Sequence, residues 1–242
     1  MKFVCIRNVK LMNIKYLFGV IIGLFISCES TSQSLKSKKT MDNELKYLAL
    51  GDSYTIGESV SESQRWPVQL VEKLRNTGKK IAPPKIIAKT GWTTDELKAR
   101  IIKENVIEKF DLVSLLIGVN NQYRGRNAEE FRKEFVDLLE TAIQFADNNK
   151  NRVFVVSIPD WGVTPFGLNS SRPDISKSID LFNAICKAET EKRGILYIDI
   201  TPISRKAPDD ASLIAEDGLH PSGKMYQMWT EKIQPLIMQQ LN

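Results

Sequence analysis

The sequence predicts an α/β fold, in which the strands of a buried, mainly parallel sheet alternate with helices along the chain. From Leu45 onward, short apolar runs rich in β-branched residues alternate with longer segments whose apolar residues recur every three or four positions. The 242 residues are 42% hydrophobic and 26% charged, which is enough apolar material for one sizeable core. No period of about 20 to 50 residues recurs, so solenoid and propeller architectures are excluded.

Five apolar runs are predicted to form the strands. They lie at residues 46–51, 85–89, 111–118, 152–158 and 195–199. The segments between them predict helices at 64–77, 94–108, 127–148, 174–193 and 222–240. In the longest of these segments, Phe131, Phe135 and Leu138 recur at helical spacing with charged residues between them, so we expect one face to pack against the sheet.

The first 27 residues are typical of an export signal. Residues 16–27 are apolar and uncharged, follow Lys10 and Lys15, and are fewer than the about 20 apolar residues that a membrane-spanning helix needs. Residues 25–28 (FISC) resemble the lipobox of bacterial lipoproteins, which implies lipidation of Cys28 and anchoring of an exported protein in the bacterial cell envelope. Two alternatives stay open: Cys28 as an incidental thiol, and Met12 as the true start.

The segment that follows the signal is predicted to be a flexible tether. Residues 28–44 are rich in Ser, Thr and Lys and contain few large apolar groups, so they cannot offset the entropy cost of folding. The predicted domain is therefore 45–242. Because Cys186 is its only cysteine, it has no internal disulfide, and the helical pattern around Cys186 predicts a buried small hydrophobe.

The formal net charge of +5 is concentrated at the N-terminus. Residues 1–27 contain four basic residues and no acidic one, so the rest of the chain has a balance of +1. A nearly neutral domain lacks the basic surface by which proteins bind nucleic acid. We therefore expect no nucleic-acid partner.

The candidate site residues follow the predicted strands. In open α/β sheets, ligands bind beyond the carboxyl ends of the strands. This rule selects four short segments of the chain, at residues 51–54, 90–92, 118–121 and 159–162.

His220 is the only histidine, so a reaction that needs an imidazole near neutral pH must use it. Asp217 precedes it by three residues and could accept a hydrogen bond from one ring nitrogen, as the acid of a Ser-His-Asp triad does. Pro221 favours an extended backbone at His220. The alternative is a surface ion pair between His220 and Asp217.

Ser53 follows the first predicted strand, where Gly51 permits a sharp turn that presents the hydroxyl at the edge of the sheet. The alternative is a helix cap or turn, the role that we assign to Asp52. Acyl transfer also needs donors for an oxyanion, usually a backbone N–H and a side-chain amide. Gly91 and Asn120 supply these two types, although each is also common in turns.

Ser53, Gly91, Asn120 and His220 occur in this order, and their contexts resemble the four sequence blocks of the SGNH hydrolases, also called the GDSL esterase/lipase family. The resemblance spans residues 47–240. It implies a three-layer α/β/α flavodoxin-like fold with a five-stranded sheet, and hydrolysis of an ester through an acyl-serine intermediate.

The resemblance also implies roles for the individual residues. Ser53 would attack the ester carbonyl, His220 would take and return the proton, and Asp217 would orient the ring. The N–H groups of Ser53 and Gly91 and the amide of Asn120 would bind the oxyanion. The sequence departs from the family pattern at Tyr54, in place of leucine, and at Asn121, where an aspartate often follows the oxyanion asparagine.

Competing enzyme classes find little support. The Gly-x-Ser-x-Gly elbow of the α/β-hydrolases and the Gly-x-Gly-x-x-Gly dinucleotide fingerprint are both absent. A metal hydrolase needs several converging ligands, and the predicted domain has one histidine and one cysteine. We expect no metal and no cofactor.

Trp92 and Trp161 lie at the predicted catalytic edge and are candidates for the wall of a substrate pocket, with core packing as the alternative. We expect core packing for Trp66. Residues 160–173 form the longest irregular stretch and could shape access to the site. Arg124 and Arg126 are expected to be solvated loop charges, with contact to an acidic substrate as the alternative.

No long apolar lid segment is apparent, which favours a short acyl chain, such as acetyl on a carbohydrate. A lysophospholipase or other lipid esterase and an acyltransferase remain as alternatives on the same triad. A hypothesis of another class is a non-catalytic binding lipoprotein of the cell envelope.

Overall fold

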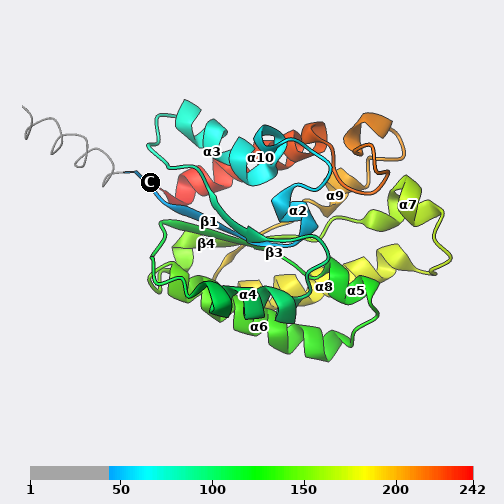
Figure 1. Cartoon of the computed structure of the whole chain (residues 1–242), viewed down its shortest axis with the longest axis horizontal. Coiled ribbons are helices and arrows are strands. Elements are labelled where there is room, and N and C mark those ends of the chain that lie inside the picture. The colour runs from blue at the N-terminus through cyan, green and yellow to red at the C-terminus, as the bar shows by residue number, and fades with distance from the viewer. Residues whose placement is uncertain (1–43, 242) are drawn as a thin grey trace, which may run out of the picture. The chain divides into compact units, whose positions relative to one another are not determined.

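The structure is a computed structural model that describes residues 44–241. In this part of the chain, five strands form one sheet in the order β2-β1-β3-β4-β5, and all four neighbouring pairs are parallel (Figure 1). Their bounds are β1 (Tyr47–Gly51), β2 (Lys85–Ala88), β3 (Leu112–Leu116), β4 (Val153–Val156) and β5 (Leu196–Ile198).

Helices cover both faces of the sheet. On one face lie α3 (Trp66–Asn76) and α10 (Gly223–Gln240), and on the other α4 (Thr94–Glu104), α6 (Ala128–Phe145) and α8 (Ile175–Glu191) (Figure 1). The predicted α/β fold with three layers is confirmed. All five predicted strands and all five predicted long helices are present, each shorter than its sequence pattern by about one to four residues.

The core lies between the sheet and these two helical layers. Every residue of β1, β3 and β4 is buried, as expected for parallel strands that are covered on both faces. Phe131 and Phe135 of α6 are fully buried, which confirms the predicted apolar face of that helix. Trp66 and Cys186 also lie in the core, as their sequence contexts predicted.

Short helices occupy the connections. They are α2 (Ser53–Ile56), α5 (Val119–Tyr123), α7 (Pro165–Leu168) and α9 (Thr201–Ser204), with single 3₁₀ turns at Glu62–Gln64, Lys150–Arg152, Trp161–Val163 and Ala211–Leu213. Residues 160–173, which we expected to be irregular, therefore contain a 3₁₀ turn and α7. Helix α4 ends before the predicted residue 108, because Asn105 adopts a left-handed backbone with φ of 46° that stops the helix.

The strand order places a topological switch between β1 and β3. The chain passes from β1 outward to β2 and then returns to β3 on the other side of β1. Connections that leave neighbouring strands in opposite directions create a crevice at the carboxyl ends of those strands. Residues that follow β1 and β3 therefore line this crevice, where ligands bind in open α/β sheets.

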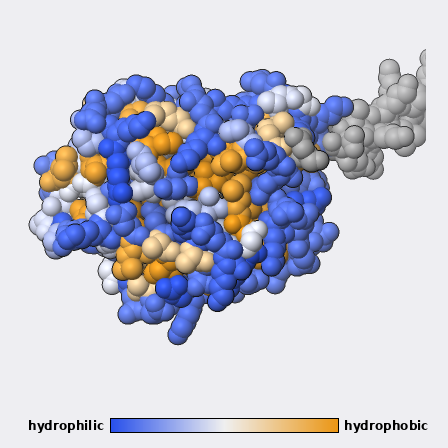
Figure 2. Space-filling view, turned by 180° about the vertical axis from the view of Figure 1, so that it is seen from behind, coloured by the Kyte–Doolittle hydropathy of each residue, from blue (hydrophilic) through white to orange (hydrophobic). Residues whose placement is uncertain are grey.

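The predicted signal peptide, its Cys28 and the tether lie outside the described residues, apart from the last tether residue. Within the described range, no helix is both long and apolar enough to span a membrane. At the end of the domain that carries α7, apolar residues are exposed among hydrophilic ones (Figure 2), and they include Phe166 and Leu168 at 44% and 70% exposure.

Candidate active site

Ser53 is the first residue of α2, directly beyond the carboxyl end of β1. A Cβ atom at Gly51 would lie 2.5 Å from the carbonyl oxygen of Leu116, so only glycine permits this close approach of β1 to β3. Asp52 caps α2, since its Oδ1 accepts a hydrogen bond from the Tyr54 backbone N–H at 3.1 Å. The predicted turn role of Asp52 is confirmed, and the turn directs Ser53 to the edge of the sheet.

His220 lies in the loop before α10, where Asp217 holds its ring. The Nδ1 atom of His220 is 2.6 Å from Oδ2 of Asp217. The other carboxylate oxygen, Oδ1, accepts the backbone N–H groups of Leu219 and His220 at 2.9 Å each. Because one turn supplies all of these contacts, the carboxylate fixes both the backbone of the loop and the imidazole that it carries.

The charge of Asp217 is stabilised by its donors. Partial burial raises its pKa, but hydrogen bonds from Ser59, His220 and Leu219 outweigh this effect and lower the pKa to about 2. Asp217 is therefore a carboxylate at neutral pH. It can stabilise a positive charge that develops on the imidazole of His220.

The two predicted oxyanion residues follow β2 and β3. Gly91 has φ of +85°, a backbone conformation that residues other than glycine rarely adopt. Among the described residues, no acceptor binds the backbone N–H of Gly91 or of Ser53. The Nδ2 atom of Asn120 donates one hydrogen bond to the Trp92 carbonyl at 2.9 Å, which leaves its second N–H for a ligand.

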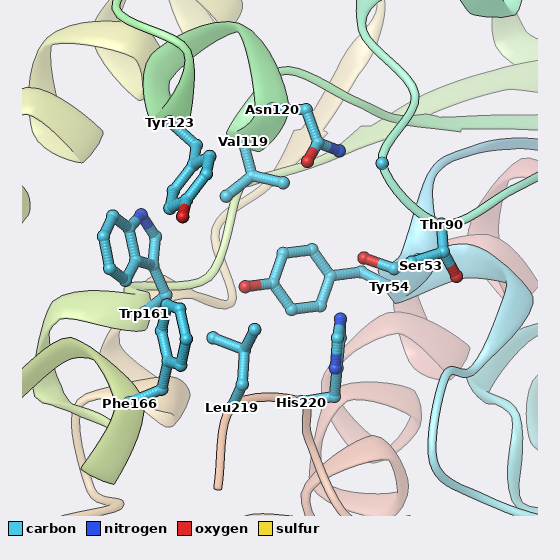
Figure 3. Close-up of a pocket in the computed structure, with 11 residues that line it drawn as sticks. Ser53, Tyr54, Thr90, Val119, Asn120, Tyr123, Trp161, Phe166, Leu219 and His220 are labelled. Atoms are coloured by element: carbon cyan, nitrogen blue, oxygen red, sulfur yellow. The ribbon is translucent and has the colours of Figure 1, made fainter. Parts of the chain in front are cut away.

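One pocket of about 200 Å³ brings these residues together (Figure 3). Its lining comprises Ser53, Tyr54, Thr90, Gly91, Val119, Asn120, Tyr123, Trp161, Phe166, Leu219 and His220. Ser53 and His220 lie on the same side of it, at 4% and 8% exposure, without a direct hydrogen bond between them. Catalytic hydrogen bonds are often longer in the absence of substrate than in the reacting complex.

Helix α5 holds the loop that contains Gly91. Asn121 accepts the Thr94 backbone N–H at Oδ1 (3.1 Å) and donates to the Thr94 hydroxyl (2.6 Å). Arg124 donates to the Gly91 carbonyl at 2.6 Å and pairs with Glu96 at 3.2 Å. The Arg124 side chain is 43% exposed, as expected for a solvated loop charge, but it also makes these two contacts. Together with Asn120, these side chains join α5 to residues 91–94.

The two candidate tryptophans differ. Trp161 lines the pocket and is 2% exposed, with its Nε1 bonded to Oε1 of Gln122 at 2.9 Å. Trp92 does not line the pocket, because its half-buried side chain packs against the core. Its contribution is the carbonyl that accepts the Asn120 amide. The proposal of Trp92 as a pocket wall is therefore corrected.

A second, wider cavity of about 590 Å³ lies beside the pocket and shares Tyr123 and Phe166 with it. Its remaining lining is mostly polar and comprises Pro165, Asn169, Ser170, Ser171, Arg172, Asp217 and Gly218. The Arg172 guanidinium lies 4.1 Å from the centre of the Tyr123 ring and donates to the Tyr123 carbonyl. We call this second cavity the polar groove.

Asp52 differs sharply from Asp217 although both lie near Ser53. Complete burial raises the pKa of Asp52 to about 7, and hydrogen bonds from the Tyr54 N–H and from its own backbone N–H offset this only in part. Its Oδ2 is buried and has no hydrogen-bond partner among the described residues. Across residues 44–241, no group of three or more His, Cys, Asp or Glu side chains is arranged to hold a metal ion.

Sequence reasoning missed several residues of the site. Tyr123, Phe166 and Leu219 wall the pocket, and Ser59 donates a hydrogen bond to Asp217. The proximity of Leu219 to His220 in the sequence was a usable signal. Nothing in the sequence indicates that Ser59 reaches a residue 158 positions away.

Comparisons with known proteins agree with this geometry. A model of the GDSL-like lipase/acylhydrolase family matches residues 49–228. No curated protein sequence matches the chain significantly.

Solved structures share the fold. A lipase/acylhydrolase from Enterococcus faecalis is 25% identical, with a TM-score of 0.63 over 80% of this chain and 95% of that one. TesA is 19% identical, with a TM-score of 0.64 over 81% of this chain and 99% of that one. Axe2, an acetylxylan esterase from Geobacillus stearothermophilus, is 18% identical, with a TM-score of 0.60 over 80% and 94%.

The family match covers most of the described residues and includes every residue that lines the pocket. The chain therefore belongs to the GDSL-like lipase/acylhydrolase family, also called the SGNH hydrolases, and is a serine ester hydrolase.

Proposed function

We propose that the protein hydrolyses esters of short acyl chains, in particular acetyl groups on carbohydrates, with Ser53, His220 and Asp217 as its catalytic triad. One observation carries the proposal: four distant segments place Ser53, Gly91, Asn120 and His220 around a single pocket. A bound ester could reach a nucleophile, a base and oxyanion donors at once.

In the proposed mechanism, the Ser53 hydroxyl attacks the ester carbonyl while His220 accepts its proton at Nε2, the ring nitrogen opposite Asp217. Asp217 stabilises the imidazolium. The N–H groups of Ser53 and Gly91 and the Asn120 amide bind the oxyanion. His220 then protonates the leaving alcohol. In the second half of the reaction, His220 accepts a proton from a water molecule that attacks the acyl-serine, and it returns this proton to the Ser53 oxygen as the bond to the acyl group breaks and the carboxylic acid leaves.

The size of the pocket supports a short acyl chain. Its volume of about 200 Å³ is small, and the aromatic side chains of Tyr54, Trp161 and Phe166 close it. The polar groove beside it offers Asn169, Ser170 and Arg172 to a hydroxyl-rich leaving group. Axe2, a structural neighbour, is an acetylxylan esterase, which agrees with this choice.

A lipid ester is the second candidate, because Phe166 and Leu168 of α7 expose apolar surface next to the pocket. An acyltransferase would use the same triad with an alcohol in place of water. Adding alcohol acceptors to the reaction and measuring transfer products would detect that activity.

Turnover of 4-nitrophenyl esters tests the reaction. We expect the acetate to be hydrolysed faster than the octanoate, and Ser53→Ala to lower kcat by about 10⁴- to 10⁶-fold. Ser61→Ala, at an exposed serine that does not line the pocket, is the matched control. Equal activity of Ser53→Ala and the unmodified protein would contradict the proposal and favour a non-catalytic binding protein.

Acetylated xylooligosaccharides and lysophosphatidylcholine test the substrate class. We expect the higher kcat/KM for the sugar ester, and we expect Arg172→Gln to raise KM for the sugar ester but not for 4-nitrophenyl acetate. Preference for the lysolipid would overturn the carbohydrate assignment and leave the esterase intact.

We also propose that the protein is a lipid-anchored protein of the bacterial cell envelope, on the basis of residues 16–28. Detergent phase partitioning of the full chain tests this. The unmodified protein should enter the detergent phase and Cys28→Ala the aqueous phase. Recovery of both proteins in the aqueous phase would contradict the anchor.

A further inference from the structure

Ser59 has an unusual backbone conformation. Five residues other than glycine have a positive φ within residues 44–241, and Asn105, Asp147, Asn148 and Asp174 account for four of them. Asn and Asp tolerate the left-handed region because their short side chains bond to the local backbone. Ser59, with φ of 63°, is the exception. Strained backbone of this kind is often retained where a side chain has a function.

The Ser59 side chain reaches the triad. Its hydroxyl donates to Oδ2 of Asp217 at 2.5 Å, and the same oxygen accepts the His220 Nδ1 contact of 2.6 Å. Since Oδ1 of Asp217 is held by two backbone N–H groups, each carboxylate oxygen has two donors. The Ser59 hydroxyl is the donor that comes from outside the 217–220 turn.

The position of Ser59 is coupled to that of the proposed nucleophile. After α2, the backbone N–H groups of Gly57 and Glu58 both donate to the carbonyl oxygen of Ser53, at 3.0 and 3.1 Å. The turn that carries Ser59 is therefore held by hydrogen bonds to the backbone carbonyl of Ser53. A hydrogen bond from Ser59 to Asp217 sets the acid of the triad relative to the nucleophile.

We propose that Ser59 is a positioning residue, which acts through Asp217 to orient His220 toward Ser53. This inference rests on the proposed triad. The Ser59 hydroxyl holds the Asp217 carboxylate in the orientation in which Oδ2 faces Nδ1 of His220. The effect of this hydroxyl on catalysis therefore requires the carboxylate of Asp217. A conventional conformation at this position would direct the side chain elsewhere, which gives the positive φ of Ser59 a role.

Two substitutions separate this role from a structural one. Ser59→Ala and Ser59→Gly both remove the hydroxyl, but only glycine relieves the positive φ. We expect both to lower kcat/KM for 4-nitrophenyl acetate by about 3- to 10-fold with KM unchanged, as for loss of one charge-assisted hydrogen bond at a partly exposed site. The Ser59→Gly protein should have the higher Tm. Ser61→Ala is again the control.

A double-mutant cycle tests the route through Asp217. In an Asp217→Ala background, we expect Ser59→Ala to cause no further loss, because the hydroxyl has lost its acceptor. Multiplicative losses, or activity that follows Tm rather than the hydroxyl, would overturn the proposal.

The activities of Ser53→Ala and Ser59→Ala distinguish a missing role of Ser59 from a wrong triad. If Ser53→Ala is inactive while Ser59→Ala retains full activity, Ser59 has no positioning role and the esterase assignment stands. If Ser53→Ala is fully active, the proposed triad itself is wrong.

Discussion

Two carboxylates near Ser53 have opposite properties because their surroundings differ. Asp217 has several hydrogen-bond donors, and its pKa is lowered to about 2, so it is ionised at neutral pH. Asp52 is fully buried with one oxygen unpartnered, and its pKa is raised to about 7. Only Asp217 combines a stable negative charge with contact to His220. These properties support Asp217 as the acid of the proposed triad and a structural role for Asp52.

The pH dependence of stability should reveal the raised pKa of Asp52. The unfolded chain loses this proton near its ordinary pKa of 3.8, whereas the folded protein keeps it to about pH 7. The unfolded state therefore binds fewer protons between pH 4 and 7, and Asp52 lowers the free energy of unfolding as pH rises, by up to about 1.4 kcal/mol per unit. This contribution becomes constant above pH 7. Asp217 acts in the opposite direction and only below pH 4.

Urea unfolding at several pH values checks this prediction. The stability of the unmodified protein should fall relative to that of Asp52→Asn from pH 4 to 7. Parallel stability curves would show that the Asp52 carboxyl titrates normally.

Asn120→Ala should lower kcat by about 10²- to 10³-fold, because it removes a side-chain donor to the oxyanion. The loss should fall mainly on kcat, since this hydrogen bond strengthens as the oxyanion forms. Steady-state kinetics with 4-nitrophenyl acetate checks this. An increase in KM alone would place Asn120 in substrate binding instead.

At the residue level, the sequence predicted what depends on residue type and on position after a strand. His220 is the only histidine, and Ser53, Gly91 and Asn120 follow three predicted strands. Ser59 could not be predicted, because its role depends on a backbone angle and on a contact across 158 residues.

Among the elements, α5 has the clearest functional role. It carries Asn120 and Asn121 and is followed directly by Arg124, and the side chains of Asn121 and Arg124 hold residues 91–94. The two predicted oxyanion donors Gly91 and Asn120, which follow different strands, are thus fixed relative to each other. This explains how an asparagine at position 121 is compatible with the family pattern, since both ends of its amide are used.

Arg124→Ala should lower kcat by about 10-fold and leave KM little changed, because the Gly91 carbonyl loses its charged donor. Arg126→Ala is the matched control, since Arg126 pairs with the side chains of Asp95 and Glu134 rather than with the Gly91 carbonyl. Equal effects of the two substitutions on kcat would show that α5 does not position the loop.

Element length decided which helices the sequence could predict. Five long helices repeat their apolar pattern over several turns. Helices α2, α5, α7 and α9 have four or five residues, which is too few for a period to emerge. Three of these four contribute residues to the pocket, so the catalytic edge was the part of the fold that periodicity described least.

For the whole molecule, the order of the strands converts distant segments into one site. Ser53 and Asn120 follow adjacent strands, β1 and β3, on the two sides of the topological switch. Because all four strand pairs in the described part of the chain are parallel, the segments that follow β1, β2 and β3 meet at the same end of the sheet. The alternation of strand and helix patterns predicted this architecture, whereas the pocket walls depend on tertiary packing.

Stability of the site should therefore depend on the middle of the sheet. Leu115 is fully buried on β3 between Leu50 and Val155. Leu115→Ala should reduce the free energy of unfolding by about 2 to 5 kcal/mol. Ile107→Ala, at a side chain that is 86% exposed, should change it by less than about 0.5 kcal/mol. Urea titration of both proteins checks this, and similar losses would contradict the assigned core.

Covalent labelling with a fluorophosphonate tests the nucleophile and its base together. Mass spectrometry of the labelled, digested protein should find the adduct on Ser53 alone, with labelling abolished in Ser53→Ala and strongly slowed in His220→Ala. An adduct on a different serine, or undiminished labelling of His220→Ala, would contradict the account.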